Sequence, residues 1–353
     1  MTVALPRLAA ALQRSWWRQQ PDLLSRGLTP LAWAYRGLWA LHRASHRLGL
    51  RQSVRLEVPV IVVGNLIVGG AGKTPVLMAL LRWLQQEGLR PGVVSRGYGR
   101  RGDAVLAVGT HSTAEAVGDE PLLIHRQCAV PVWVGRQRAA AAQALRQAHP
   151  EVNVIVSDDG LQHLALQRDA ELIVFDDRGA GNGCVLPAGP LREPLRPARP
   201  ATLPWLYNAD APSTAQAGAL LLRQLRPLRP LAAWQQGRAD EDRSLASLQG
   251  RPMLAAAGIG HPERFFAMLR ATGLQITALP LPDHHDYKSL PWPAGTPEVI
   301  VTEKDAVKLD PALCGATQVW VAGLDLQLPA ELLRPLRQLL TRLQNPSASP
   351  DAP

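Results

Sequence analysis

The sequence predicts an α/β protein with a larger parallel-sheet domain and a second, smaller α/β domain. Three observations lead to this prediction: apolar runs typical of strands buried on both faces alternate with helix patterns, they occur in two separate sets, and many end in glycine or an acid. The first run, VPVIVVGN at 58–65, is followed at 75–88 by PVLMALLRWLQQEG, which has the pattern of a crossover helix.

The two sets of runs define the expected domain organisation. The first set continues with PGVVSRGYGRRG, VNVIVSDDG and AELIVFDD. A proline-rich stretch and a weakly patterned region, reaching about residue 249, are predicted to be irregular. The second set contains RPMLAAAGIG, ITALPLPDHHDY, EVIVTEKDAVKL and TQVWVAGLD, and the helix pattern PAELLRPLRQLLTRL closes it. We therefore expect a basic N-terminal segment, a larger domain, a smaller domain and a disordered tail, with the boundaries 1–55, 56–245, 246–343 and 344–353.

The positive charge of the chain is concentrated in its N-terminal segment. The formal net charge is +9, but residues 1–55 hold nine arginines and a single acid, Asp22. The remaining 29 basic and 28 acidic residues nearly cancel. A nucleic-acid-binding surface spread over the protein is therefore disfavoured, and the basic excess must serve a local purpose.

Cysteine and lysine usage narrow the possibilities further. The three cysteines, Cys128, Cys184 and Cys314, form no C-x-x-C pair, which argues against a disulfide framework and a zinc site and indicates a reducing compartment. Only four of the 38 basic residues are lysines, namely Lys73, Lys288, Lys304 and Lys308. Where arginine is so strongly preferred, a retained lysine indicates a position that needs a compact ammonium group.

The N-terminal segment contains a basic amphipathic helix pattern with several tryptophans. Between residues 31 and 51 leucines recur at helical spacing and the arginines fall largely on the other side; four of the ten tryptophans lie in this segment, at Trp16, Trp17, Trp33 and Trp39. The apolar stretch is too short and too interrupted to span a membrane, and no signal-peptide cleavage pattern follows it. The pattern predicts a helix that lies in the membrane interface. The alternative is an ordinary helix packed on the domain with its arginines in solvent.

The stretch GGAGKT, between a strand and a helix, is a candidate phosphate-binding loop. Glycines let backbone N–H groups converge on phosphate, and the helix N-terminus adds partial positive charge. Ile67 stands where the strict pattern has a glycine, but the compact loop supplies the same donors. Lys73 would reach the β- and γ-phosphates, and the Thr74 hydroxyl would hold Mg²⁺. The predicted nucleotide contacts are Ile67, Val68, Gly69, Gly70, Ala71, Gly72, Lys73 and Thr74.

Two consecutive carboxylates, Asp158 and Asp159, end the strand run VIVSDDG. Parallel strands deliver such side chains to the sheet edge that also carries the phosphate loop. We therefore predict that Asp158, Asp159 and Thr74 form a Mg²⁺ site, with an acidic turn after a strand as the alternative.

Four further motifs contain candidate catalytic or substrate-binding residues. Asp119, in AVGDEPLL, is a candidate base for a substrate hydroxyl, or alternatively a helix cap. In PDHHDYK two adjacent histidines would point to opposite faces, so one histidine assisting an acid or base fits better than a metal pair. Arg96, in SRGYGR, is a fixed cation suited to phosphate, and LREP adds Arg192 and Glu193. Read alone, the last two motifs are equally compatible with structural roles.

Together these motifs resemble the tetraacyldisaccharide 4′-kinase family of lipid A synthesis in Gram-negative bacteria. The matching segments occur in the family's order: VGNLIVGGAGKTPV (63–76), VVSRGYGRR (93–101), VGDEPLLI (117–124), VSDDGLQH (156–163), GNGCVLPAGPLRE (181–193), AAGIGHPERF (256–265), PDHHDY (282–287) and VTEKDAVK (301–308). One segment, ATLPWLYNADAP, departs from the regular strand ending in Asn-Gly that the family has there, so we assign no nucleotide-base contact in it.

The resemblance implies an enzyme that transfers the γ-phosphoryl group of ATP, with Mg²⁺, to the 4′-hydroxyl of a tetraacylated glucosamine disaccharide 1-phosphate. It implies a P-loop domain facing a smaller α/β domain across a cleft, with Asp119 and His284 activating the hydroxyl. The expected partners are the acylated lipid substrate and a membrane surface, at the cytoplasmic face of the bacterial inner membrane. No nucleic acid and no obligate protein partner is expected.

Two readings from other functional classes compete with the kinase. One is a P-loop GTPase or ATP-driven switch, but TEKD at 302–305 lacks the spacing of a guanine-selecting Asn/Thr-Lys-x-Asp motif. The other is a membrane-surface binding protein with a vestigial loop, and the intact Lys73 and Thr74 argue against such decay.

Overall fold

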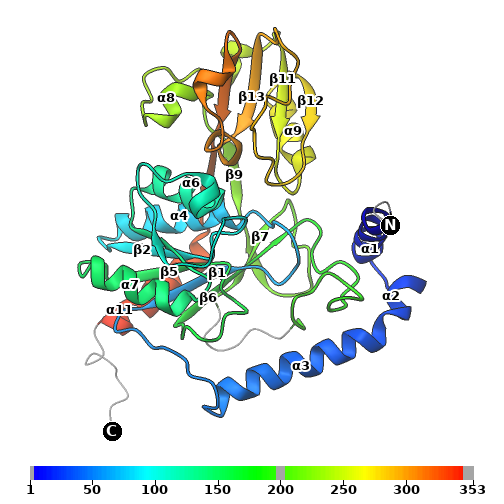
Figure 1. Cartoon of the computed structure of the whole chain (residues 1–353), viewed down its shortest axis with the longest axis vertical. Helices are drawn as coiled ribbons and strands as arrows, with labels where there is room; N and C mark the ends of the chain where they lie inside the picture. Colours follow the sequence, from blue (N-terminus) through cyan, green and yellow to red (C-terminus); the bar gives the residue numbers. More distant parts are fainter. Residues whose placement is uncertain (1–3, 196–202, 345–353) are drawn as a thin grey trace.

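The computed structural model describes residues 4–195 and 203–344, so the predicted tail at 344–353 lies outside the described part except for residue 344, which ends the last helix. The described chain forms a larger unit below and a smaller unit above, joined by two extended strands (Figure 1). The joining strands, β9 (Leu222–Leu225) and β15 (Leu324–Gln327), pair antiparallel with each other.

The larger unit is built on a sheet with the strand order β3–β4–β2–β5–β1–β6–β7–β8, parallel except for β3. Its strands are β1 (Val60–Gly64), β2 (Pro91–Ser95), β3 (Leu106–Ala107), β4 (Val132–Val134), β5 (Val154–Asp158), β6 (Ala170–Asp176), β7 (Trp205–Asn208) and β8 (Gly218–Leu220). Every residue of β1 and β5 is buried, which confirms that these apolar runs are strands covered on both faces.

Helices cover both faces of the larger sheet (Figure 1). α4 (Lys73–Gln86) and α6 (Asp119–Cys128) share a hydrophobic cluster with Ile61. α7 (Arg138–Ala148) packs with the neighbouring Val60 in a separate cluster. Since consecutive residues of a strand point to opposite faces, the two clusters lie on opposite sides of the sheet. A single helical turn, α5 (Ala114–Val117), precedes α6.

The smaller unit is a second sheet with the order β10–β14–β13–β11–β12, parallel except for β10. Its strands are β10 (Arg229–Pro230), β11 (Pro252–Ala257), β12 (Gln275–Pro280), β13 (Glu298–Thr302) and β14 (Gln318–Ala322). Its helical elements are α8 (Leu231–Gln235), η1 (Leu245–Leu248), α9 (Pro262–Ala271), α10 (Glu303–Ala306) and η2 (Pro311–Cys314).

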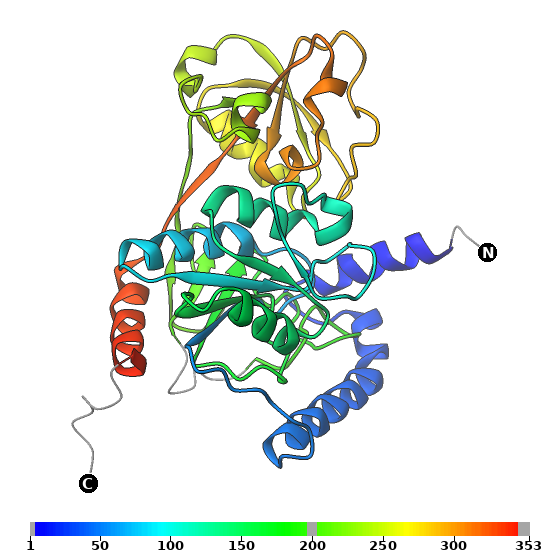
Figure 2. The same ribbon diagram turned by 60° about the vertical axis from the view of Figure 1, so that its left-hand side comes forward.

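Some elements lie elsewhere than the sequence pattern suggested. The region predicted to be irregular contains β7 to β10 and α8, so that prediction is wrong there; the strands are only two to four residues long and show no periodicity. The closing helix α11 (Ala330–Gln344) packs on α4 of the larger unit, where Arg337 binds Glu87 (Figure 2). We therefore propose that the smaller unit runs from about residue 226 to residue 323, where Arg226 N donates to Gly323 O.

The N-terminal segment forms three helices, α1 (Ala4–Trp16), α2 (Leu23–Gly27) and α3 (Thr29–Arg47). One side of α3 packs on the larger unit, where Tyr35 Oη donates to the Arg192 carbonyl (2.6 Å) and Arg43 is buried against Glu193. Arg43 thus does not face solvent as the sequence pattern suggested. The opposite side exposes a leucine stripe, formed by Leu31, Leu38, Leu41 and Leu48. Among the helices described here, none has the length and apolar character needed to cross a bilayer.

Polar contacts fix the junction between α1 and α2 to the loop that follows β6. The Trp16 carbonyl accepts from Asn182 N (2.8 Å), and Trp16 Nε1 donates to the Pro187 carbonyl (2.9 Å). Next to it, the guanidinium of Arg178 lies 4.2 Å from the centre of the Trp17 ring. These contacts fix the N-terminal segment to the larger unit.

Candidate active site

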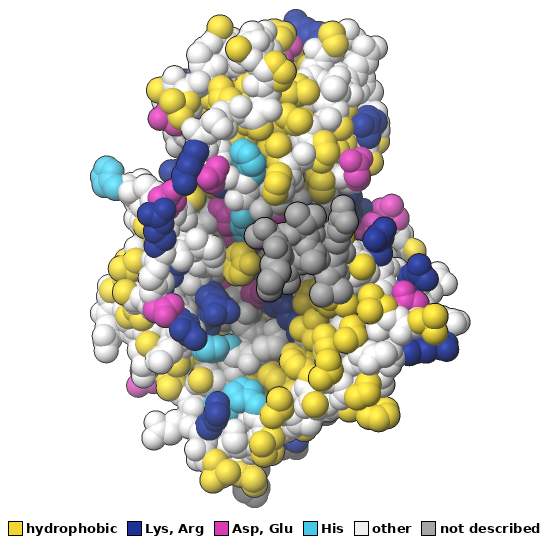
Figure 3. All heavy atoms as spheres, turned by 45° about the vertical axis from the view of Figure 1, so that its right-hand side comes forward, with side chains coloured by type: hydrophobic (Ala, Val, Ile, Leu, Met, Phe, Trp, Pro, Cys, Tyr) yellow, Lys and Arg dark blue, Asp and Glu magenta, His cyan; other side chains and the backbone are white. Residues whose placement is uncertain are grey.

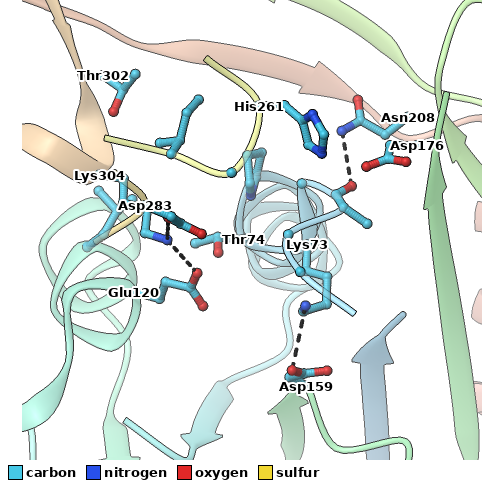
Figure 4. Close-up of a pocket in the computed structure, with 18 of the residues that line it drawn as sticks. Lys73, Thr74, Glu120, Asp159, Asp176, Asn208, His261, Asp283, Thr302 and Lys304 are labelled. Carbon is cyan, nitrogen blue, oxygen red and sulfur yellow. Dashed lines mark hydrogen bonds and ion pairs between the residues drawn. The ribbon is translucent and has the colours of Figure 1, made fainter. Parts of the chain in front are cut away.

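A cavity of about 750 Å³ lies between the larger and the smaller unit. Its lining comes from the phosphate loop, the ends of β5, β6 and β7, and the segments 259–268, 283–284 and 302–304 of the smaller unit. Figure 4 shows Lys73, Thr74 and Asp159 on one side of this space and Asp283, Thr302 and Lys304 on another. Residues far apart in the sequence therefore meet at one site.

The phosphate loop connects β1 to α4 and has the backbone that its glycines predict. Gly72 adopts a left-handed conformation (φ 74°), and a Cβ there would lie 2.1 Å from Asn208 Nδ2, so only glycine fits. Lys73 begins α4 and is 8% exposed; its ammonium lies 3.3 Å from Asn65 Oδ1 and 3.6 Å from Asp159 Oδ2. The lysine is thus held in place by neutral and anionic oxygen atoms at the edge of the cavity.

Ile67, at the position of the missing glycine, is fully buried in an apolar cluster and forms a backbone bridge with Leu191. Val68 N donates to the Pro190 carbonyl (2.9 Å). The loop's contribution to the cavity lining begins at Gly69. Ile67 and Val68 therefore anchor the start of the loop, which supports loop contacts to phosphate from Gly69 onward.

Asp158 and Asp159 end β5 and differ in their surroundings. Ser95 Oγ donates to Asp158 Oδ2 (2.9 Å), while Asp158 Oδ1 is buried and has no hydrogen-bond partner among the residues that the structure describes. Burial, reinforced by Glu120 and Asp159, raises the pKa of Asp158 to about 7. Burial alone would also raise the pKa of Asp159, but Lys73 and Arg192 outweigh it and hold this pKa below its ordinary value. The unsatisfied Asp158 oxygen is the atom that a bound cation would satisfy.

Asp119 opens helix α6 and lies against His284 of the smaller unit, with 2.8 Å between Asp119 Oδ2 and His284 Nδ1. His284 has a left-handed backbone (φ 60°), a strained conformation for a residue other than glycine. His284 lines the cavity, while Asp119 is 5% exposed behind it. Burial favours a raised pKa for Asp119, but His284, Lys304 and Lys308 lower it below its ordinary value.

Of the two adjacent histidines, only His284 has a described contact with Asp119. His285 instead packs its ring edge-on against Tyr287, with 4.6 Å between the ring centres. This arrangement agrees with the expectation of one assisting histidine.

The sequence of the chain matches one known family over almost its whole length. The sequence profile of LpxK, described as tetraacyldisaccharide-1-P 4′-kinase, matches residues 24–341. The chain belongs to the tetraacyldisaccharide 4′-kinase family.

Individual members of the 4′-kinase family are similar to the chain over most of its length. A tetraacyldisaccharide 4′-kinase of Leptothrix cholodnii is 51% identical over 99% of this chain and 100% of its own. One from Methylibium petroleiphilum is 53% identical over 90% of each chain. A crystal structure of LpxK from Aquifex aeolicus in complex with ATP is similar in fold, with a TM-score of 0.73 and 26% identity over 91% of this chain and 99% of that one.

Three residues predicted to bind the 4′-kinase substrate occupy different positions. Arg96 is exposed and lines the cavity. Arg192 also lines it and donates from Nη1 to both carboxylate oxygens of Asp159 (2.9 Å each). Glu193 is buried; its Oε1 accepts from Gln162 Nε2 (3.0 Å), and its Oε2 lies 4.0 Å from Arg43 of α3. The geometry favours substrate contacts for the two arginines and a structural role for Glu193.

Other residues of the site were not predicted from the sequence. Asn208, at the end of β7, donates to the Ala71 carbonyl (3.2 Å), and Arg178 donates to the Gly70 carbonyl (2.7 Å) while pairing with Asp176. Each therefore supports a different peptide of the phosphate loop. The four-residue strand that carries Asn208 shows no periodicity of its own, and only the family resemblance pointed to a strand ending in asparagine there, whereas the run AELIVFDD did predict an acid at the position of Asp176.

Proposed function

We propose that the protein transfers the γ-phosphoryl group of ATP to the 4′-hydroxyl of a tetraacylated glucosamine disaccharide 1-phosphate. As a member of the 4′-kinase family the chain is a kinase of lipid A biosynthesis. The observation that carries the proposal is that a phosphate loop and an Asp–His pair, contributed by different units, border one cavity. Phosphoryl transfer needs mainly positioning and charge neutralisation, which this arrangement can supply.

In this proposal the phosphate loop from Gly69 to Thr74 holds the nucleotide phosphates, and Lys73 neutralises charge that develops during transfer. His284 is the member of the Asp119–His284 pair that the acceptor hydroxyl meets, because Asp119 lies behind it. The pair accepts the hydroxyl proton at the imidazole, and Asp119 orients the ring and stabilises its charged form. Arg96 and Arg192 contact phosphate or the sugar lipid at the mouth of the cavity.

A Mg²⁺ ion would bind at the side chains of Thr74 and Asp158, with Asp159 nearby. Asp158 fits this role because one of its oxygens is buried without a partner, whereas Asp159 already pairs with Lys73 and Arg192. When bound, the ion would neutralise phosphate charge, and such ions characteristically take one or two carboxylates together with phosphate oxygens and water.

A transfer assay tests the proposed activity. Protein, Mg²⁺ and γ-labelled ATP are mixed with a detergent-dispersed acylated glucosamine disaccharide 1-phosphate, and label is followed into the lipid phase. Label in the lipid supports the kinase. Label released only as free phosphate contradicts it and favours the ATP-driven switch.

Binding of Mg²⁺ with ATP is expected to release a proton from Asp158 near neutral pH. With a pKa of about 7, Asp158 is protonated in about half of the molecules at pH 7 before the cation binds, and a carboxylate ligand must be ionised. Release from this group should therefore grow as the pH falls below 7 and vanish as the pH rises toward 9.

Isothermal titration calorimetry in two buffers of different ionisation enthalpy measures this release. The control is the Asp158→Asn variant. Any protons that ATP itself releases on binding are the same in the variant and in the unchanged protein, so the difference between the two reports the proton from Asp158. Equal proton release from both proteins would remove Asp158 from the cation site.

We further propose that the leucine stripe of α3 lies on a lipid surface. Leu38 and Leu41 are each 67% exposed, and Figure 3 shows hydrophobic side chains gathered on the lower part of one face of the molecule. Arg36 and Arg47 are exposed on the same helix and would be drawn to anionic lipid. The surface would bring the cavity close to an acceptor that stays in the bilayer, at the cytoplasmic face of the inner membrane.

Replacing Leu38 and Leu41 together by serine is expected to weaken binding to anionic vesicles at least tenfold, because each leucine side chain that leaves an apolar phase loses on the order of 1.5–3 kcal/mol. Co-sedimentation with phosphatidylglycerol-containing vesicles measures the change. The matched control is Leu222→Ser, since Leu222 is also 67% exposed but lies on β9. Unchanged sedimentation of the double variant would exclude the stripe as the lipid contact.

A further inference from the structure

Lys304 bridges the two units, and Figure 4 shows it close to Glu120 and Asp283. It lies on α10 of the smaller unit, and its ammonium is 3.0 Å from Glu120 Oε1 of the larger unit and 3.3 Å from Asp283 Oδ1 of the smaller one. The ammonium also lies 3.4 Å from His284 Nε2 and 3.9 Å from Asp119 Oδ2. Lys304 is largely buried, and the carboxylates of Glu120, Asp119 and Asp283 raise its pKa despite that burial.

The contact between Lys304 and His284 constrains the imidazole, because an ammonium group donates hydrogen bonds and cannot accept them. A ring nitrogen that lies this close to Lys304 Nζ must therefore direct its lone pair toward the ammonium and accept a hydrogen bond from it. His284 Nε2 is then unprotonated, and the ring proton lies on Nδ1, where it is donated to Asp119 Oδ2. In this tautomer the lone pair lies at the end of the ring away from the buried Asp119.

The charges around His284 show what the ring would experience without Lys304. Asp119 faces Nδ1, and Asp283 Oδ1 lies 3.8 Å from Nε2, so each ring nitrogen has a carboxylate nearby. Glu120 completes a group of three acids. The compensating ammonium groups are Lys304 and Lys308, and Lys308 reaches Asp119 and Asp305. The remaining neighbour is the Tyr98 ring, whose centre is 5.1 Å from that of His284. Removal of Lys304 would leave Asp283 free to attract a proton onto Nε2.

We propose that Lys304 is a positioning residue that fixes the tautomer of the His284 ring, with the proton on Nδ1 and the lone pair of Nε2 available to accept the hydroxyl proton. This proposal rests on the proposed kinase mechanism. When the acceptor hydroxyl replaces the ammonium at His284 Nε2, the ammonium of Lys304 stays bound to Glu120 and Asp283. Since Asp119 and Glu120 belong to the larger unit and Lys304 and His284 to the smaller, the complete arrangement forms only when the two units are together.

Nitrogen-15 NMR of the histidine rings in the unchanged protein tests the proposal directly. The His284 signals are assigned by their absence in His284→Gln. At pH 8 we expect the pattern of a neutral ring protonated on Nδ1. A ring protonated on Nε2, or on both nitrogens, would overturn the proposal without any need for a Lys304 variant.

Lys304→Met removes the donor at nearly constant side-chain length. In this variant we expect His284 to carry a proton on Nε2 at pH 8 and turnover to fall roughly tenfold to a hundredfold, the range for losing a group that orients a functional histidine. KM for ATP should stay unchanged. Lys304→Arg keeps a cationic donor and should keep the neutral ring protonated on Nδ1, so it provides the test if the methionine variant fails to fold.

The matched control is Lys288→Met, because Lys288 also reaches from the smaller unit to an acid of the larger one, Glu115, but is 65% exposed. It should leave both the His284 signals and turnover unchanged. An unchanged tautomer in Lys304→Met would overturn the role of Lys304 alone. Full turnover in His284→Gln would instead overturn the base assignment of the proposed function, so the two failures are distinguishable.

Discussion

Replacing Lys73 by methionine is expected to lower phosphoryl transfer by at least about a thousandfold, because the ammonium would neutralise charge on the transferred group in a site that excludes water. The folded state should survive the change. Asp159 keeps both contacts with Arg192, and Asn65 keeps its bond to the Gly69 carbonyl. Single-turnover transfer of label from γ-labelled ATP to the lipid acceptor measures the loss.

Lys288→Met is the control for this substitution, since it removes a lysine from an exposed site while the chemical change is the same. A Lys73→Met protein that is folded, as judged by circular dichroism, and retains more than a few per cent of turnover would contradict the role of the phosphate loop.

Replacing Asp119 by asparagine is expected to lower turnover by roughly 10² to 10⁴, the range for removing general base catalysis. The amide is uncharged, and it can present a donor to His284 Nδ1, which would move the ring proton to Nε2. ATP binding should change little, because Asp119 does not line the described cavity and lies on α6 rather than on the phosphate loop.

Transfer kinetics and nucleotide titration together measure the effect of Asp119→Asn. Glu115→Gln is a suitable control, since it also neutralises an acid just before α6 but at a site that is 59% exposed. Loss of ATP affinity in parallel with turnover would show that Asp119 acts through the nucleotide site rather than on the acceptor hydroxyl.

The sequence predicted the larger sheet well where periodicity and loop chemistry agreed. The runs that became β1, β2, β5 and β6 are long, apolar and end in residues with clear functions, so each could be identified alone. β7 could not, because WLYN is short and follows a proline-rich stretch, and its burial comes from neighbouring strands and from loops and helices far away in the sequence.

The position of α11 depended on tertiary contacts that the sequence does not encode locally. Its amphipathic pattern predicted a helix correctly but not the surface on which the helix packs. The deciding contacts bury Leu332, Leu336 and Leu340 in the hydrophobic cluster that contains α4, about 250 residues earlier in the chain. Sequence order alone had placed it with the smaller unit, its nearest neighbour along the chain.

The sequence predicted the individual motifs of the candidate site but not the contacts between them. Glycine spacing predicted the phosphate loop, and the position of the paired acids after a strand predicted the edge of the sheet. The contacts between Lys304, Glu120 and Asp283 join segments that lie up to 184 residues apart. The scarcity of lysine had indicated that Lys304 was retained for a reason, but only the packing of the two units reveals its neighbours.

The attachment of Trp16 and Trp17 to the loop after β6 has a consequence for how the enzyme can be studied. That loop carries Arg178, which contacts the Gly70 carbonyl, and it leads to Arg192, which contacts Asp159. Removing the first fifty residues to obtain a protein that is easier to handle would therefore remove contacts that hold this loop in place, although none of those residues lines the described cavity. Kinetic constants measured on such a shortened enzyme would describe a catalyst with an altered phosphate loop, and point substitutions on the outer face of α3 are the sounder way to separate attachment from chemistry.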